Sequence, residues 1–141
     1  GGVPQFHVLI VEDNEATRQQ WRRTLNAEGC KVSEAENGRI ALESLSQARP
    51  DLILLDLIMP EMDGFEFLIQ LRNQPAFKTV PVVVVTAASL SEQDRQRLHG
   101  GVERVLAKHA FSGDELLEEL RELVTRHVLG RRILEKASRD G

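Results

Sequence analysis

The chain alternates short β-type runs with stretches in which apolar residues recur at helical spacing. Strand patterns separated by helical patterns are typical of a parallel sheet with helices on both of its faces. Because such a sheet is covered on both sides, its central strands form nearly continuous hydrophobic runs. The sequence therefore predicts an α/β fold with five strands, at residues 7–11, 31–34, 52–55, 82–85 and 102–106.

Apolar stripes between these runs predict the helices that cover the sheet. The first three stripes are Thr17, Trp21 and Leu25; then Ile40, Ala41, Leu45 and Ala48; and finally Phe65, Leu68 and Ile69. Residues 89–98 offer little beyond Leu90 and Leu98 to hold a helix onto a sheet, so we expect the fourth helix to be short or mobile.

A Ser-x-x-Glu pattern at Ser112 and Glu115 predicts the start of the last helix, whose apolar face begins at Leu116. Residues 6–128 are interpreted as one domain and residues 1–5 as a linker or a vector-derived remnant. Residues 129–141 form a C-terminal tail that either extends the last helix or frays.

Composition narrows the function classes. A chain of 141 residues can bury roughly 68–70% of its unfolded surface, which suffices for one self-supporting core. The net charge of -4 gives no reason to expect nucleic acid or an anionic membrane as partner. The single cysteine, Cys30, excludes an internal disulfide and a thiol cluster for zinc. No apolar stretch approaches the ~20 residues that span a bilayer, so we expect no direct membrane insertion.

Polar groups stand at the ends of four strand runs. Asp56 ends the run that begins at Leu52, and Glu12 and Asp13 follow the first strand. An isolated buried carboxylate is prohibitively costly, so these acids must meet a surface, a metal or a cation. Thr86 and Lys108 follow the fourth and fifth strands, and parallel strands deliver their carboxyl ends to one edge. Together these groups suggest a hard-cation site and phosphoryl transfer to a carboxylate.

This constellation resembles the receiver domain of bacterial two-component response regulators over roughly residues 6–127. The resemblance implies a flavodoxin-like (βα)5 fold, a doubly wound parallel sheet with strand order 2-1-3-4-5. It rests on residues that stand in the family's order and spacing: Glu12-Asp13, Asp56 before Met59-Pro60, Met62-Asp63-Gly64, Thr86-Ala87 and Lys108.

The resemblance also implies a role for each site residue. Mg²⁺, with Mn²⁺ as a substitute, would be the cofactor. The implied roles are Asp56 as phosphoacceptor and metal ligand, Asp13 and the Ile58 carbonyl as metal ligands, Glu12 as a ligand through water, Lys108 on the phosphoryl oxygens, Thr86 as the hydroxyl that reorients, and Leu57 and Ala87 as backbone contacts to the phosphoryl group.

Partners and context follow from the same resemblance. The phosphoryl donor would be a phosphohistidine on a histidine kinase or a histidine phosphotransfer domain. The chain would be a cytoplasmic signalling domain rather than an enzyme, catalysing only its own phosphorylation and dephosphorylation. The segment from Leu90 to Phe111 is most similar to receivers at the C-terminal end of hybrid histidine kinases, with kinase domains in cis and a tether to the membrane through the parent kinase. The resemblance allows a dimer through the face of the fourth helix, fifth strand and fifth helix.

Three departures from the family pattern change the expectations. His109 stands where the family usually has a proline after the lysine, and a non-proline cis bond would cost ~2.5–4 kcal/mol, so Lys108 is expected in a trans or less rigid loop. Val105 replaces the usual aromatic switch residue. Ile58 and Ala88 offer no polar group to position a hydrolytic water, which favours a slowly hydrolysed acyl phosphate.

Two alternatives remain open. A haloacid-dehalogenase-type phosphatase also uses an aspartate after an apolar strand, but it needs a second acid where this chain has Ile58. A degenerate receiver that binds partners without being phosphorylated is disfavoured by the intact acids and Lys108.

Overall fold

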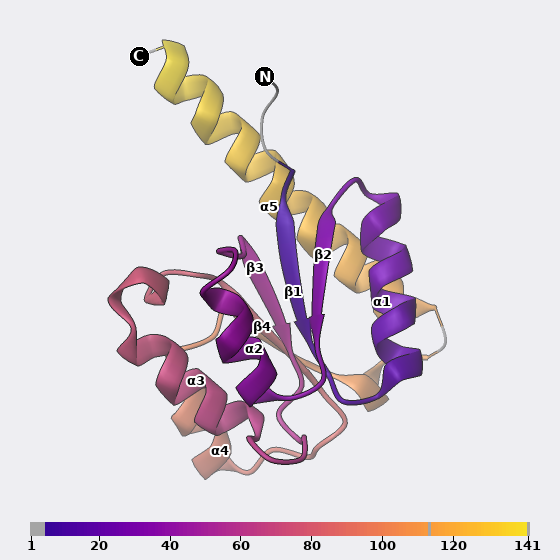
Figure 1. Cartoon of the computed structure of the whole chain (residues 1–141). Helices are drawn as coiled ribbons and strands as arrows, with labels where there is room; N and C mark the ends of the chain where they lie inside the picture. The colour runs from indigo at the N-terminus through magenta and orange to yellow at the C-terminus, as the bar shows by residue number, and fades with distance from the viewer. Residues whose placement is uncertain (1–4, 113, 141) are drawn as a thin grey trace.

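The computed structural model describes residues 5–112 and 114–140. Strands and helices alternate along this part of the chain (Figure 1). The strands are β1 (His7–Val11), β2 (Lys31–Ala35), β3 (Leu52–Leu55), β4 (Val82–Thr86) and β5 (Arg104–Ala107). The helices are α1 (Glu15–Ala27), α2 (Gly38–Leu45), α3 (Gly64–Asn73), α4 (Glu92–Leu98) and α5 (Glu115–Asp140), with 3₁₀ turns η1 (Pro75–Phe77) and η2 (Lys108–Ala110).

Within the described residues the strands form one parallel sheet in the order β2-β1-β3-β4-β5. The predicted flavodoxin-like topology is thereby confirmed. The first and third strands lie where the apolar runs predicted them. The fifth begins at Arg104 rather than at Val102, because Val102 packs onto the core from the preceding loop.

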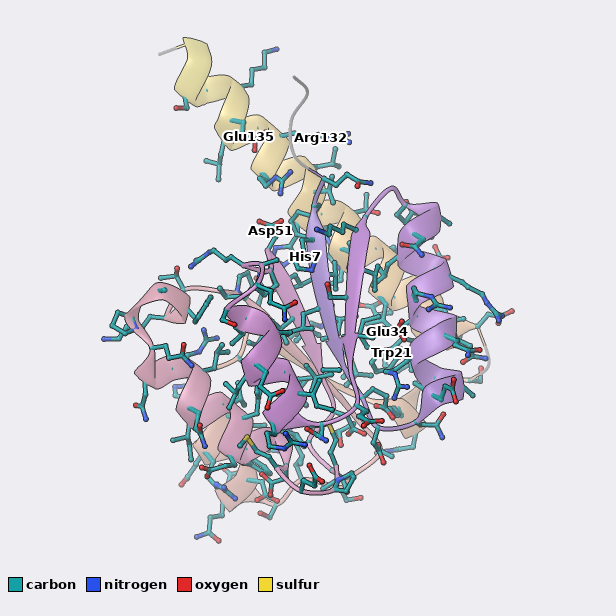
Figure 2. The ribbon with its side chains drawn as sticks, in the orientation of Figure 1. His7, Trp21, Glu34, Asp51, Arg132 and Glu135 are labelled. Atoms are coloured by element: carbon teal, nitrogen blue, oxygen red, sulfur yellow. The ribbon has the colours of Figure 1, made fainter. Side chains whose placement is uncertain are left out.

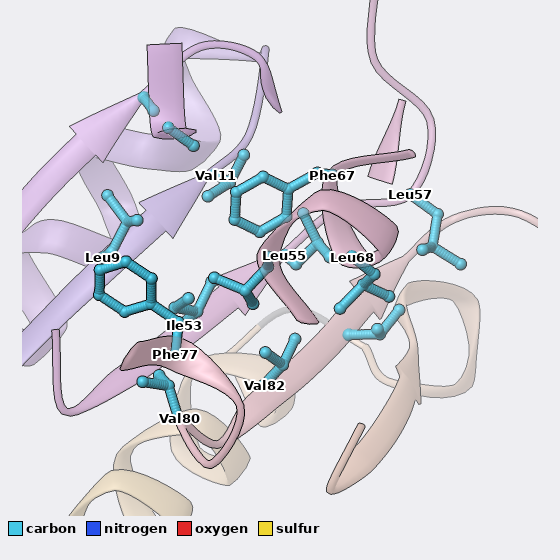
Figure 3. Packing of buried hydrophobic residues seen from close by; sticks show 14 of the residues in the cluster. Leu9, Val11, Ile53, Leu55, Leu57, Phe67, Leu68, Phe77, Val80 and Val82 are labelled. Atoms are coloured by element: carbon cyan, nitrogen blue, oxygen red, sulfur yellow. The ribbon is translucent and has the colours of Figure 1, made fainter. Parts of the chain in front are cut away.

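Two apolar layers cover the sheet, because alternate residues of each strand face opposite sides. Leu9 and Val11 pack with Phe67 on the side of α2 and α3 (Figure 3). Val8 and Ile10 pack on the other side with residues of α1 and α5. Every residue of β1, β3 and β4 is buried, which explains why these strands are hydrophobic apart from His7 and Thr86 at their ends.

The predicted face of α3 is wrong in one position. Ile69 is 52% exposed, and Phe67 and Leu71 are buried with Leu68 instead. The phase of the helix is set by Gly64, because a Cβ atom there would lie 2.7 Å from the Asp56 carbonyl oxygen. Residues at i+3, i+4 and i+7 from Gly64 therefore face the sheet.

The last two helices answer the questions that the sequence left open. α4 is short, with seven residues, and begins at a capping box between Ser91 and Asp94. α5 continues past Gly130 to Asp140, so the tail extends the helix. At 1.5 Å per residue its 26 residues span about 39 Å, and Figure 1 shows it projecting beyond the sheet. Among the described helices none combines the length and apolarity needed to cross a membrane.

Candidate phosphoryl-transfer site

Three carboxylates meet at the carboxyl edge of the two central strands. Glu12 follows β1 and its N–H donates to the Ala35 carbonyl at 3.1 Å. Asp56 follows β3 and its N–H donates to the Val11 carbonyl at 2.9 Å. One oxygen from each of Glu12, Asp13 and Asp56 lies within 4.8 Å of the others. The strand ends thus bring together the three acids that the sequence predicted.

The turn after β1 is held by α1. Arg18 donates from Nη1 to the carbonyl oxygens of Glu12 at 2.8 Å and Asp13 at 3.1 Å. Asn14 caps the helix through its side chain, and its N–H donates to Glu12 Oε1 at 3.3 Å. Sequence reasoning missed Arg18, because nothing in the local pattern indicates that a helix residue reaches back to the turn.

The three acids differ in solvent exposure. Glu12 and Asp56 are buried, whereas Asp13 is exposed. Burial and then the neighbouring Asp56 carboxylate raise the pKa of Glu12 from 4.5 to about 7, although Lys108 opposes the rise. Three carboxylates lie here against the one ammonium group of Lys108, so a bound cation would offset charge that the lysine leaves uncompensated.

Lys108 reaches the acids from the far end of β5. The preceding residue, Ala107, pairs with Thr86, which fixes where the lysine leaves the sheet. Its Nζ lies 3.2 Å from Glu12 Oε2 and 3.7 Å from Asp56 Oδ2. The described residues contain no cis peptide bond, so His109 follows in trans within η2, as expected without proline.

The remaining predicted residues lie at or just after the carboxyl ends of β3 and β4. Thr86 is fully buried, and its Oγ1 accepts from the Ala88 N–H at 3.2 Å. The Ile58 N–H donates to Asp56 Oδ1 at 3.3 Å, while the Ile58 side chain is 62% exposed. Leu57 is buried directly after Asp56.

Asp63 and Gly64, at the start of α3, lie next to the loop that carries Asp56. Asp63 caps α3 by accepting from the Glu66 N–H at 2.9 Å, so this residue of the family motif serves the start of the helix. The Gly64 N–H donates to the Leu57 carbonyl at 2.9 Å. The absence of a side chain at Gly64 allows this close approach to the backbone that carries Asp56.

Comparison with known proteins agrees with this geometry. The model of the response regulator receiver domain matches residues 8–121. The KDP operon transcriptional regulatory protein KdpE of Escherichia coli is 40% identical over 121 residues, which cover 86% of this chain and 52% of KdpE. The chain spans about half the length of curated relatives such as KdpE.

Two solved structures are also similar. The Mn²⁺-bound form of the response regulator Rcp1 is 29% identical with a TM-score of 0.74, covering 85% of this chain and 91% of that one. The signal receiver domain of a histidine kinase from Syntrophus aciditrophicus is 34% identical with a TM-score of 0.67, covering 85% and 92%.

The chain belongs to the response regulator receiver domain family. Receivers of this family are phosphoacceptor signalling domains of two-component systems, and they act with histidine kinases or phosphotransfer proteins.

Proposed function

We propose that this domain accepts a phosphoryl group on Asp56 from a phosphohistidine and thereby changes its partner-binding surface. The observation that supports the proposal most strongly is the convergence of Asp56, two further acids and Lys108 at one sheet edge. Asp56 attacks phosphorus through a carboxylate oxygen, an acyl phosphate forms, and the bond to the imidazole nitrogen of the donor breaks.

The residues around Asp56 have separate tasks in this proposal. Lys108, now 3.7 Å from Asp56 Oδ2, compensates charge on the phosphoryl oxygens. The Thr86 hydroxyl turns from the Ala88 N–H toward the phosphoryl group, and the backbone N–H groups of Leu57 and Ala87 contact its oxygens. Because such transfer consists mainly of positioning and electrostatic stabilisation, these groups suffice for self-phosphorylation without a separate enzymatic activity.

The donor set fits a hard divalent cation. Mg²⁺ prefers one or two carboxylates together with waters and carbonyl oxygens, and three carboxylates lie close together here. Asp13, Asp56 and the Ile58 carbonyl would hold the ion directly and Glu12 through water. When bound, Mg²⁺ or Mn²⁺ offsets the repulsion between the carboxylate and the phosphoryl oxygens. The Mn²⁺-bound structure of Rcp1 supports this assignment.

The acceptor assignment is tested with acetyl phosphate as a small phosphodonor. In the presence of Mg²⁺ we expect the parent domain to gain the mass of one phosphoryl group, and Asp56→Asn to gain none. Asp63→Asn is the matched control, because asparagine keeps the cap of α3 and lies outside the acid cluster. A phosphoryl increment on Asp56→Asn equal to that of the parent would show that Asp56 is not the acceptor.

The metal assignment is tested by removing one carboxylate. Asp13→Asn deletes one of two direct carboxylate ligands, so we expect Mg²⁺ affinity to fall by at least about tenfold, as followed by Trp21 fluorescence. Glu15→Gln, an exposed acid at the start of α1, should leave the titration unchanged. Equal affinities for Asp13→Asn and the parent would contradict the ligand set.

The phosphodonor and context are further proposals. We infer a histidine kinase or a phosphotransfer domain as donor, on the cytoplasmic side of the membrane. Attachment to a hybrid kinase in cis is supported by the missing proline after Lys108 and by the receiver from Syntrophus aciditrophicus. The likeness to KdpE supports a separate response regulator instead. Mass spectrometry of the full-length gene product decides between these two contexts.

A further inference from the structure

Lys108 has an aromatic neighbour as well as its acidic ones. Its Nζ lies over the ring of Trp21, 5.6 Å from the centroid. Trp21 belongs to α1, is 1% exposed and packs in the core layer between α1, α5 and the sheet (Figure 2). The ammonium group therefore has a buried indole as well as the carboxylates of Glu12 and Asp56 among its neighbours.

Neither the side chain of Lys108 nor the backbone around it fixes the position of the ammonium group. A lysine side chain has a flexible four-carbon stem, and holding its ammonium in one place has an entropic cost. Pairing of β5 with β4 ends at Ala107, and the backbone then turns through η2 with His109 after the lysine. The position of the Lys108 ammonium group therefore depends on the side chains around it.

The two carboxylates alone do not define that position. Both attract the ammonium toward the acids, and Glu12 lies nearer than Asp56, at 3.2 Å against 3.7 Å. An ammonium drawn wholly to Glu12 would be less available to a group on Asp56. Indole is the aromatic ring that attracts a cation best, and this indole cannot move away because it is buried in the core.

We propose that Trp21 is a positioning residue for Lys108: its indole face holds the ammonium group where it can meet a phosphoryl group on Asp56. The inference rests on the proposed function and adds a residue to it. Trp21 touches neither the phosphoryl group nor the metal, and acts only through Lys108. A tryptophan that serves the core alone would support the fold but would show no dependence on the lysine.

The contact itself is measured by fluorescence without any ligand. Trp21 is the only tryptophan and the chain has no tyrosine, so intrinsic emission reports on this indole. Lys108→Met keeps the length of the stem but removes the charge, and we expect it to change the emission of the folded protein. Arg104→Met removes a cation from the other end of β5, where Arg104 pairs with Glu119 at 2.7 Å, and should leave the emission unchanged. Superimposable spectra for Lys108→Met and the parent would overturn the proposal.

The functional step is measured by a double-mutant cycle on the rate of phosphorylation by acetyl phosphate. We expect Trp21→Met to slow the reaction roughly three- to tenfold in the parent, the range that a partly desolvated cation–π contact represents. Trp21→Phe keeps an aromatic face, so it should slow the reaction less than Trp21→Met does. In the Lys108→Met background, Trp21→Met should cause no further loss.

Leu25→Ala is the control for a general effect of packing, because Leu25 is buried on the same helix face. Its effect on the rate should be the same with and without Lys108. If Trp21→Met is unfolded by circular dichroism, the same cycle with Trp21→Phe and the fluorescence comparison decide the question. Equal loss for the Trp21 variant in both backgrounds would overturn the inference alone, whereas a parent that is never phosphorylated on Asp56 would overturn the proposed function together with it.

Discussion

At the scale of single residues, the buried carboxyl group of Glu12 makes the acid cluster sensitive to pH. Its carboxyl group is buried beside Asp56, and the pKa of Glu12 is raised from 4.5 to about 7. A raised pKa means that the folded state binds the proton more tightly than the unfolded chain does. The stabilisation of the folded state that results is fully present at a pH below 4.5, the ordinary pKa of Glu12, and is lost as the pH rises through about 7.

We therefore expect the free energy of unfolding of the metal-free domain to fall by roughly 1–3 kcal/mol because of Glu12 as pH rises from 5 to 8. Glu12→Gln cannot ionise, so its stability relative to the parent should be greater at pH 8 than at pH 5. Urea unfolding without divalent cations measures this difference, with Glu15→Gln as the exposed control on α1. Parallel pH profiles for Glu12→Gln and the parent would contradict the prediction.

At the scale of elements, the strands and the acid cluster were predictable and the phase of α3 was not. Apolar runs that end in Glu12 and Asp56 identify both strands and both acids, because the ends of parallel strands share one edge. In α3 the apolar residues at positions 65, 67, 68, 69 and 71 are compatible with two helix faces. The choice depends on the close approach of Gly64 to the loop after β3, which the sequence alone does not reveal.

The contact between Trp21 and Lys108 escaped sequence reasoning for a similar reason. The helical stripe predicts that Trp21 is buried, and its burial is confirmed. The contact of Trp21 with Lys108 depends on how α1 lies against the end of β5, and these two segments are far apart in the sequence. A cation–π contact between them leaves no periodic signal in the sequence.

The fourth helix shows how a short element is held by few contacts. Only Leu98 is buried within α4, and Leu90 packs partly against the core just before it. Arg97 stacks on the Phe65 ring, with its guanidinium carbon 3.9 Å from the centroid. Because Phe65 follows Gly64, this stack links α4 to the segment that touches the backbone of Asp56.

We expect Arg97→Ala to loosen α4 and to lower the free energy of unfolding by about 1 kcal/mol, the scale of an exposed cation–π contact. Amide hydrogen exchange should accelerate within α4 while β1 and β3 stay protected. Arg95→Ala serves as the control, since Arg95 is an exposed cation in the same helix. Unchanged exchange in α4 for Arg97→Ala would show that the stack does not hold the helix.

At the scale of the whole molecule, the acid cluster and the extension of α5 lie at opposite ends of the sheet. Arg131 Nη1 donates to Asp51 Oδ2 at 2.8 Å. The same oxygen accepts from the His7 N–H at 2.8 Å, and Figure 2 labels Asp51 and His7 at this end of the sheet. His127 Nε2 lies 2.6 Å from Glu103 Oε2. These contacts join α5 to the amino-terminal ends of β1, β3 and β5, so the first turns of the extension move with the domain.

In the proposed function, phosphorylation of Asp56 must act on a distant surface, and Val105 stands where the family usually has an aromatic switch residue. Val105 is half-buried against the core, and its branched side chain has few rotamers, so it cannot swing as a ring does. We expect the segment after Thr86 to carry the conformational change instead. It leaves the site directly, exposes Ala87, and continues into the weakly anchored α4.

We therefore expect beryllofluoride, an acyl-phosphate mimic, to order residues 87–98 when it binds with Mg²⁺. The Thr86 hydroxyl would leave the Ala88 N–H for the ligand and draw the loop after it toward the site. Hydrogen exchange should then show increased protection chiefly in residues 87–98, whereas α5 beyond Arg131 should be unchanged; Asp56→Asn supplies the control without a bound mimic. Full protection of 87–98 before ligand is added, or a change confined to β5 around Val105, would rule out this route and return the coupling to the fifth strand.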